Sequence, residues 1–304
     1  MKILVSGATG YIGGNLVKWL IRNKHEVSIL VRPNSIIPKA EFPEQKIKTY
    51  VYDGSLKSIV DALEDANPFI VCHLASLFLS QHQPEDVSRL IESNINFPTQ
   101  ILEAMSLMGV SNFINTGTSW QHYQNEEYNP VNLYAATKQS FENIAKYYAN
   151  AKAINVITLS LFDTYGPGDR REKLFTLLRN SIYNGTSLKM SPGLQKLNLV
   201  YIDDVMRAYQ NTIDNFSSLS KTTYGIGSGK TIELNKLVEM YARITSREIK
   251  IKWGDLPYRE REVMTPWKNF KNLPNWAPTV DLSDGIMAME KDPTINGLCS
   301  TRKK

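Results

Sequence analysis

The first half of the chain alternates short apolar, β-branched runs with longer amphipathic stretches. Apolar runs bounded by turn residues predict strands, and apolar residues spaced three or four apart predict helices. We expect strands over residues 2–6, 27–31, 47–52, 69–74, 112–116 and 155–161. The clearest helices are expected over residues 12–23, 94–108 and 133–149. Such alternation predicts an α/β fold, with a doubly wound parallel sheet between two layers of helices.

The alternation weakens after Gly166, where prolines and aromatic residues become more frequent. We therefore expect a first domain over residues 1–165, with residues 197–230 returning to it. A smaller C-terminal α/β domain, over residues 166–304, is expected to bind the substrate. Its polar end, from about Asp292, predicts a loose tail.

The composition is that of a globular protein, with 42% hydrophobic and 21% charged residues among 304. A net charge of +5 is spread along the chain and does not by itself select nucleic acid as a partner. Cys72 and Cys299 match no metal or disulfide spacing, which favours a reducing cytoplasm and no metal site. The first strand leaves no room for a signal peptide, and no apolar run approaches the ~20 residues of a membrane span. We expect a cytoplasmic protein without membrane or nucleic-acid partners.

A glycine-rich turn follows the first predicted strand and opens the first predicted helix. Glycines there allow positive backbone angles and let main-chain N–H groups approach a pyrophosphate. The helix N-terminus adds free donors and a favourable dipole. This context predicts a Rossmann-type dinucleotide-binding domain. The expected contacts come from Gly7, Thr9, Gly10, Tyr11, Ile12 and Gly13.

The end of the second predicted strand indicates which dinucleotide is bound. NAD-binding proteins usually place Asp or Glu there to hold the ribose 2′-hydroxyl, whereas this chain has Arg32. A cation would attract a 2′-phosphate, so NADPH is favoured and NAD stays possible. Asp53, followed by Gly54, is positioned to accept from the adenine amino group. The alternatives are an exposed strand-end arginine and an aspartate that only forms a turn.

Tyr134 and Lys138 lie four residues apart and therefore on one face of the predicted helix. On an exposed surface such a pair contributes only about 0.2 to 0.5 kcal/mol. Beside a buried coenzyme, a cation ~4 Å from a phenolate at an effective dielectric of ~20 is worth about 4 kcal/mol. That is roughly three pKa units, enough to make the phenol a general acid or base near neutral pH. Thr118 follows a predicted strand, and its hydroxyl could bond the same reacting oxygen.

With these motifs the chain resembles extended short-chain dehydrogenases/reductases of the NAD-dependent epimerase/dehydratase family, which act on nucleotide-diphosphate sugars. The resemblance spans about residues 1–290. Besides the glycine turn, Thr118, Tyr134 and Lys138, it rests on His73-Leu74-Ala75, Asn94, the segments 165–168 and 201–205, Arg259 and the segment 275–278.

The resemblance implies roles for individual residues. Tyr134 would exchange a proton with the sugar hydroxyl, Lys138 would tune it and bond the nicotinamide ribose, and Thr118 would orient the substrate. Leu74 and Ala75 would line the coenzyme. Ser119, Asp163 and Arg259 would contact substrate, with Arg259 gripping the diphosphate.

Two further implications concern charge and assembly. Asp163 stands where the family usually has Asn, and a carboxylate there would repel a diphosphate unless it is protonated or paired. Family members usually pair through the helices that correspond to residues 94–108 and 133–149, so a homodimer is expected.

The residues after Thr118 bear on the reaction. Dehydratases of the family carry an Asp-Glu pair there, whereas this chain has Ser119-Trp120. A 4-keto reductase using NADPH is favoured by Arg32 and by similarity to the reductases that finish CDP-activated 3,6-dideoxyhexoses for polysaccharide biosynthesis. A 4-epimerase with tightly held NAD is the alternative. A non-catalytic NADP-binding regulator is a more remote one, because such proteins usually lack the Tyr or Lys that this chain has.

Overall fold

The computed structural model describes residues 1–36 and 47–292, so Cys299 and most of the predicted tail lie outside the described residues. The chain forms two compact units. The first contains Met1–Leu161, Met206–Ile226 and Asn269–Trp276, and the second contains Phe162–Val205, Gly227–Lys268 and the chain from Ala277.

The first unit is built on a seven-stranded sheet in the order β11-β6-β5-β4-β1-β2-β3, and every neighbouring pair is parallel. Its strands are β1 (Lys2–Ser6), β2 (Glu26–Val31), β3 (Ile47–Val51), β4 (Ile70–His73), β5 (Asn112–Thr118), β6 (Asn155–Leu161) and β11 (Thr223–Ile226). The predicted doubly wound parallel sheet is confirmed. The sequence analysis identified six of these strands and missed β11.

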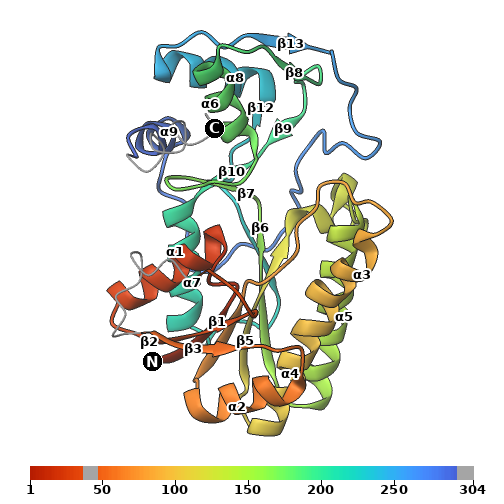
Figure 1. Cartoon of the computed structure of the whole chain (residues 1–304), viewed down its shortest axis with the longest axis vertical. Coiled ribbons are helices and arrows are strands. Elements are labelled where there is room, and N and C mark those ends of the chain that lie inside the picture. Colours follow the sequence, from red (N-terminus) through yellow and green to blue (C-terminus); the bar gives the residue numbers. More distant parts are fainter. Residues whose placement is uncertain (37–46, 293–304) are drawn as a thin grey trace. The chain divides into compact units, whose positions relative to one another are not determined.

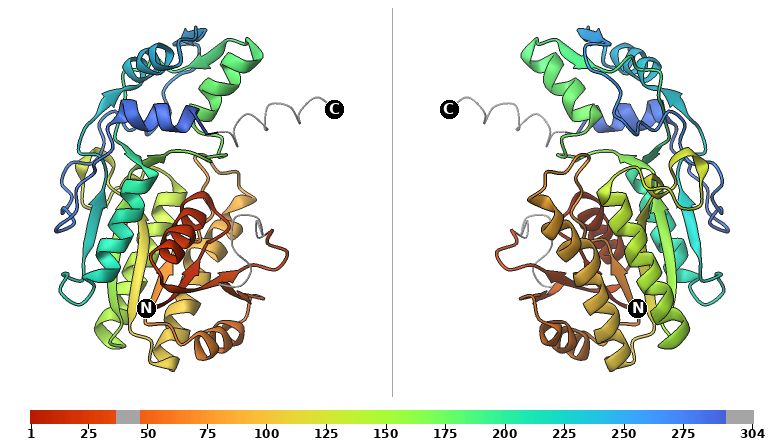
Figure 2. Two further views of the ribbon diagram at one scale, coloured as in Figure 1. Left: turned by 90° about the vertical axis from the view of Figure 1, so that its left-hand side faces the viewer. Right: turned by 90° about the vertical axis from the view of Figure 1, so that its right-hand side faces the viewer.

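Helices cover both faces of this sheet, as Figures 1 and 2 show. One layer contains α2 (Leu56–Ala66), α3 (Asp86–Ile91), α4 (Phe97–Met108) and α5 (Leu133–Ala151), and the other contains α1 (Tyr11–Arg22) and α7 (Ile202–Asp214). The core beneath α2, α4 and α5 contains Leu4, Leu30 and Val71, one from each of three neighbouring strands. α1 buries Leu16, Val17 and Leu20, which its helical spacing places on one face.

The division of the chain differs in detail from the one expected. The first unit ends at Leu161, and the chain returns to it at Met206–Ile226 and again at Asn269–Trp276, where no return was expected. The fully buried Tyr209 of α7 explains the first of these returns, because its hydroxyl lies 2.6 Å from Thr116 Oγ1 on β5. Thr116 Oγ1 itself donates to the His73 carbonyl on β4. The second return pairs with the edge strand β11, because the Gly225 N–H donates to the Lys271 carbonyl.

The second unit combines three small sheets with helices. β7 (Asp163–Tyr165) pairs with β10 (Leu199–Tyr201), β8 (Leu188–Met190) with β13 (Ile251–Trp253), and β9 (Lys196–Leu197) with β12 (Ile232–Glu233). Its helices are α6 (Leu174–Asn184), α8 (Leu234–Thr245) and α9 (Leu282–Glu290). Glu290 joins all three, since one of its oxygens accepts from Arg179 and from Tyr241. Within the described ranges, no helix combines the length and apolarity needed to cross a membrane.

One edge of the large sheet positions the site. The carboxyl ends of parallel strands share an edge, and the register pairs Ser6 of β1 with His73 of β4, and His73 with Asn115 of β5. From β1 the chain runs through β2 and β3 on one side, and β4 then follows on the other side of β1. The strand order therefore switches between β1 and β4, which is where ligands bind in open α/β sheets.

Candidate active site

The glycine turn after β1 packs directly against the end of β4. Gly7 has φ +80°, and a Cβ added to it would lie 2.4 Å from the Ala75 nitrogen. A Cβ on Gly13 would lie 2.1 Å from the Gly7 carbonyl oxygen. Only glycine fits at positions 7 and 13. Main-chain atoms rather than side chains therefore face the space beyond the carboxyl ends of β1 and β4.

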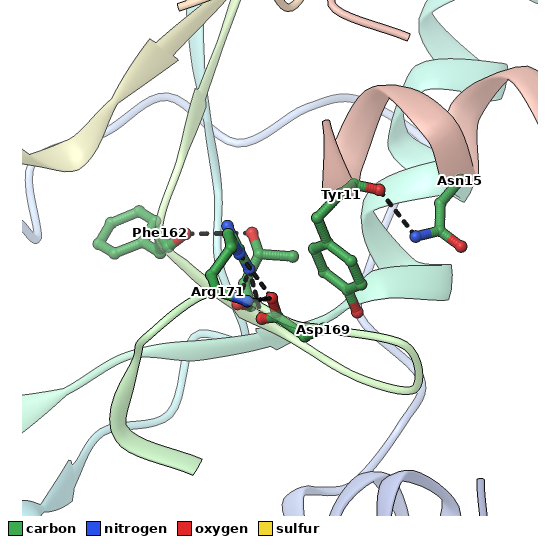
Figure 3. Close-up of polar contacts among 6 residues, drawn as sticks. Tyr11, Asn15, Phe162, Asp169 and Arg171 are labelled. Atoms are coloured by element: carbon green, nitrogen blue, oxygen red, sulfur yellow. Dashed lines mark hydrogen bonds and ion pairs between the residues drawn. The ribbon is translucent and has the colours of Figure 1, made fainter. Parts of the chain in front are cut away.

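The N-terminus of α1 is suited to an anion. Its N-cap is Gly10, which supplies no side-chain hydrogen bond, and the first turn contains no acidic residue. The N–H groups of that turn have no acceptor within the helix, and the helix dipole favours a negative group there. Asn15 donates to the Tyr11 carbonyl at 2.8 Å inside the helix (Figure 3). Thr9 is exposed and Ile12 is half-buried beside this turn.

A cavity of about 400 Å³ lies at the ends of β2 and β3. Its lining is formed by Arg32, Pro33, Asn34, Ser35, Tyr52, Asp53 and Gly54. The structure thus brings together the three residues predicted to hold the adenosine end of the coenzyme. Hydrogen bonds from the Ser55 hydroxyl and N–H to Asp53 Oδ1 lower the pKa of the Asp53 carboxyl, so this side chain is an anion and an acceptor at neutral pH. The turn and the cavity together fit a dinucleotide.

Thr118 ends β5 and caps the 3₁₀ turn that follows it. Its Oγ1 accepts from the Trp120 N–H at 3.4 Å, a bond that does not use the hydroxyl hydrogen. Its own N–H donates to Gln121 Oε1 at 2.9 Å. The Val131 N–H donates to the Trp120 carbonyl and so closes this segment. The residues from Thr118 to Tyr134 therefore form a compact loop along α5.

The start of α5 is fixed by its N-cap residue. Asn132 Oδ1 accepts from the Ala135 N–H at 2.9 Å, and Asn132 Nδ2 donates to the Leu79 and Ser80 carbonyls. The helix that carries Tyr134 is therefore tied to the segment after β4. Phe78 from that segment packs edge-on against the Tyr134 ring, with 5.0 Å between the ring centroids.

Lys138 lies one helical turn after Tyr134 and is only 2% exposed. Burial lowers the pKa of Lys138 to about 8, and the nearby charge of Glu142 acts against that lowering. The amine is therefore mostly protonated at pH 7. On β4, burial and the charge of Lys138 hold the pKa of His73 well below its usual range, so this ring is neutral. His73 Nδ1 lies 2.8 Å from Ser6 Oγ, and both residues belong to the core.

The structure places two predicted substrate contacts, Asp163 and Arg259, in the second unit. Asp163 is half-buried, and its charge opposes the lowering that burial causes in the pKa of Lys173. The carboxylate thus has a cation near it. In the loop between Asp163 and Lys173, Arg171 forms an ion pair with Asp169 and donates to the Thr164 carbonyl (Figure 3). Arg259 is exposed in a turn closed by the Glu262 N–H.

Sequence reasoning assigned no role to three residues that support the site. Asn94 is buried, accepts from the Leu77 N–H, and donates to the Thr137 hydroxyl on α5. Gln121 is fully buried behind Thr118. Asn132 and Gln121 each carried a local signal, an Asn before a helix and a Thr-x-x-Gln capping box. Asn94 gave no such signal, because its partners are distant in sequence.

The sequence model of the family described as NAD dependent epimerase/dehydratase matches residues 3–227 of this chain. The chain belongs to this family. The expected membership in this family, and the expectation of a nicotinamide-dependent enzyme that acts on nucleotide sugars, are confirmed.

The relatives of this epimerase/dehydratase family member include CDP-abequose synthases and UDP-sugar 4-epimerases. A CDP-abequose synthase from Yersinia pseudotuberculosis is 29% identical over 276 residues, covering 90% of this chain and 94% of that protein. A UDP-glucuronate 4-epimerase from Thermodesulfobacterium geofontis is 24% identical over 309 residues, covering 93% of each. Among solved structures, UDP-glucuronic acid 4-epimerase from Bacillus cereus, in complex with UDP-glucuronic acid and NAD, superposes with a TM-score of 0.84 at 24% identity, covering 95% of this chain and 98% of that one.

Replacing Gly7 tests the dinucleotide turn. We expect Gly7→Ala to weaken binding of NADPH and NADH at least about tenfold, because the methyl group must displace the Ala75 backbone. Isothermal titration calorimetry measures this. Gly14→Ala is the matched control, since its methyl would lie 3.2 Å from the Ala8 oxygen and should change affinity much less. Equal affinity in Gly7→Ala and the unsubstituted protein would contradict the assignment.

Proposed function

We propose that this enzyme uses NADPH to reduce the C4 keto group of a nucleotide-diphosphate 6-deoxy sugar, with Tyr134 as the proton donor. The observation that carries the proposal is the pair at the start of α5: Tyr134, and the buried Lys138 one turn later. Thr118, at the end of β5, is the third member of the group. Relatives named CDP-abequose synthase support a CDP-activated sugar as substrate.

The chemistry assigned to the chain is proton delivery. A cation close to a phenol stabilises the phenolate, so the phenol gives up its proton more readily to an oxygen that is gaining negative charge. Lys138 is mostly protonated at neutral pH and is shielded from water, which strengthens its effect on Tyr134. The Thr118 hydroxyl hydrogen would bond the same substrate oxygen. The nicotinamide coenzyme, when bound by the glycine turn, supplies the hydride.

The surroundings of Tyr134 favour a deoxygenated sugar. Phe78 is 43% exposed, and its ring contacts both Tyr134 and the Trp120 ring, whose centroid is 5.7 Å away. An apolar rim of this kind suits a C6 methyl group, whereas a carboxylate at that carbon would lose hydration without gaining a partner. This supports a 6-deoxy sugar over a uronic acid.

The preference for NADPH rests on Arg32. Its side chain lines the cavity at the ends of β2 and β3, where a guanidinium can hold a 2′-phosphate with two hydrogen bonds. Asp53 lines the same cavity and would accept from the adenine amino group. Contacts of Ser119, Asp163 and Arg259 with the substrate, and the homodimer, stay predictions.

A substrate panel tests the proposed reaction. The protein is incubated with CDP- and UDP-linked 4-keto-6-deoxy sugars and NADPH, and coenzyme oxidation and sugar product are followed together. We expect one NADPH oxidised for each sugar reduced. Interconversion of 4-hydroxy epimers without net oxidation would instead identify a 4-epimerase and contradict the proposal.

Replacing Tyr134 tests its role as the acid. We expect Tyr134→Phe to lower kcat at least about 100-fold, because the ring keeps its packing but loses the transferable proton. NADPH affinity should stay near that of the unsubstituted protein. Tyr128→Phe, a change on the exposed part of the same loop, is the control and should keep full activity. A Tyr134→Phe variant with more than about a tenth of the original rate would refute the assignment.

Reversing the charge at Arg32 tests coenzyme choice. We expect Arg32→Asp to shift the ratio of kcat/KM for NADPH over NADH by about tenfold or more toward NADH, the range of one lost charge-assisted hydrogen bond. Arg22→Asp makes the same charge change on the exposed end of α1, outside the cavity lining, and should leave the ratio unchanged. A ratio that stays the same in Arg32→Asp would rule out a 2′-phosphate contact.

A further inference from the structure

A buried hydrogen-bond network lies behind Thr118. The Gln121 side chain is fully buried, and its Oε1 accepts from the Thr118 N–H at 2.9 Å. Its Nε2 donates to Gln139 Oε1 and to Glu142 Oε1, both at 2.9 Å. One amide group therefore links the end of β5 to two positions on α5.

Glu142 is held from several sides. Its Oε2 accepts from the Thr223 hydroxyl of β11 at 3.4 Å, and its Oε1 would lie only 3.0 Å from a Cβ added to Gly117. The absence of a side chain at Gly117 thus lets β5 approach the carboxylate. Glu142 follows Lys138 by one helical turn, a spacing that places the two side chains about 5 to 6 Å apart at Cβ.

The titratable groups around Lys138 come from two elements. On α5 they are Glu142, whose charge raises the pKa of Lys138, and the Tyr134 phenol one turn earlier. On β4 the neighbour is His73, which is fully buried and neutral at physiological pH. Burial raises the pKa of the Glu142 carboxyl, and the Gln121 hydrogen bond and the charge of Lys138 act against that rise. Glu142 is therefore the acidic group one turn from the buried ammonium.

We propose that Glu142 is a positioning residue that keeps the Lys138 ammonium charged, and that Gln121 couples Glu142 to Thr118. The proposal rests on the proposed function, in which Tyr134, Lys138 and Thr118 act together. It predicts that one network controls the three groups. Removing the Glu142 carboxylate changes the pKa of Lys138, and removing the Gln121 amide changes both that pKa and the position of Thr118.

The direct test is the titration of Lys138 by NMR of ¹³Cε-labelled lysine in the full-length protein without coenzyme or sugar. Lys138→Met assigns the signal. We expect Glu142→Gln, which keeps the size of the side chain and one acceptor oxygen for Gln121, to lower the pKa of Lys138 by about one unit. The high-pH limb of the kcat profile should move to lower pH by the same amount. Glu142→Asp, which keeps the charge, should restore most of the shift.

Glu103→Gln is the matched control. Glu103 also accepts a hydrogen bond from α5, at the Tyr148 hydroxyl, but ten residues beyond Lys138. It should leave the Lys138 titration unchanged. If Glu142→Gln does not fold, Gln121→Met removes the donor to Glu142 and should lower the Lys138 pKa by a smaller amount.

A Lys138 titration that is the same in Glu142→Gln as in the unsubstituted protein, or in Gln121→Met where the first variant does not fold, would overturn the proposal. This outcome is distinct from failure of the proposed function. The titration needs no substrate, whereas an incorrect function would show as no turnover in the sugar panel.

Discussion

A buried ammonium group is the constraint around which the first unit is organised. Lys138 is 2% exposed, and removing such a group from water is costly unless other charges and hydrogen bonds compensate. The compensation comes from Glu142, which is held by Gln121 and Thr223. The same amide binds the Thr118 N–H. Keeping one cation charged in the interior therefore also fixes the end of β5 against α5, where the proposed proton-transfer groups lie.

A second constraint acts on the backbone at the switch point between β1 and β4. Gly7 approaches Ala75 so closely that no side chain fits, which brings the dinucleotide turn against the end of β4. The segment after β4 is in turn held by Asn94 and Asn132, and its Phe78 ring packs against Tyr134. Coenzyme turn and proposed proton donor are thus connected through one short segment.

The sequence predicted those parts of the molecule that leave a local pattern. The strands of the large sheet are apolar runs with clear boundaries, and the Tyr134–Lys138 spacing shows a shared helix face. Asn94 could not be found in this way, because it bonds to partners 17 and 43 residues away. Asn132 has a local N-cap signal, but that signal does not show its bond to a carbonyl 53 residues away. The second unit was outlined only coarsely, since its strands are two or three residues long and show no periodicity.

The central claim is that Tyr134, made acidic by Lys138, protonates a C4 carbonyl while hydride reaches the same carbon. The most direct measurement uses NADPH in which both hydrogens at nicotinamide C4 are replaced by deuterium, with a CDP-linked 4-keto-6-deoxy sugar and mass spectrometry of the product. The account predicts one deuterium at C4 of the sugar and an equal amount of NADP released. A product formed without deuterium at C4, or without release of NADP, would contradict it.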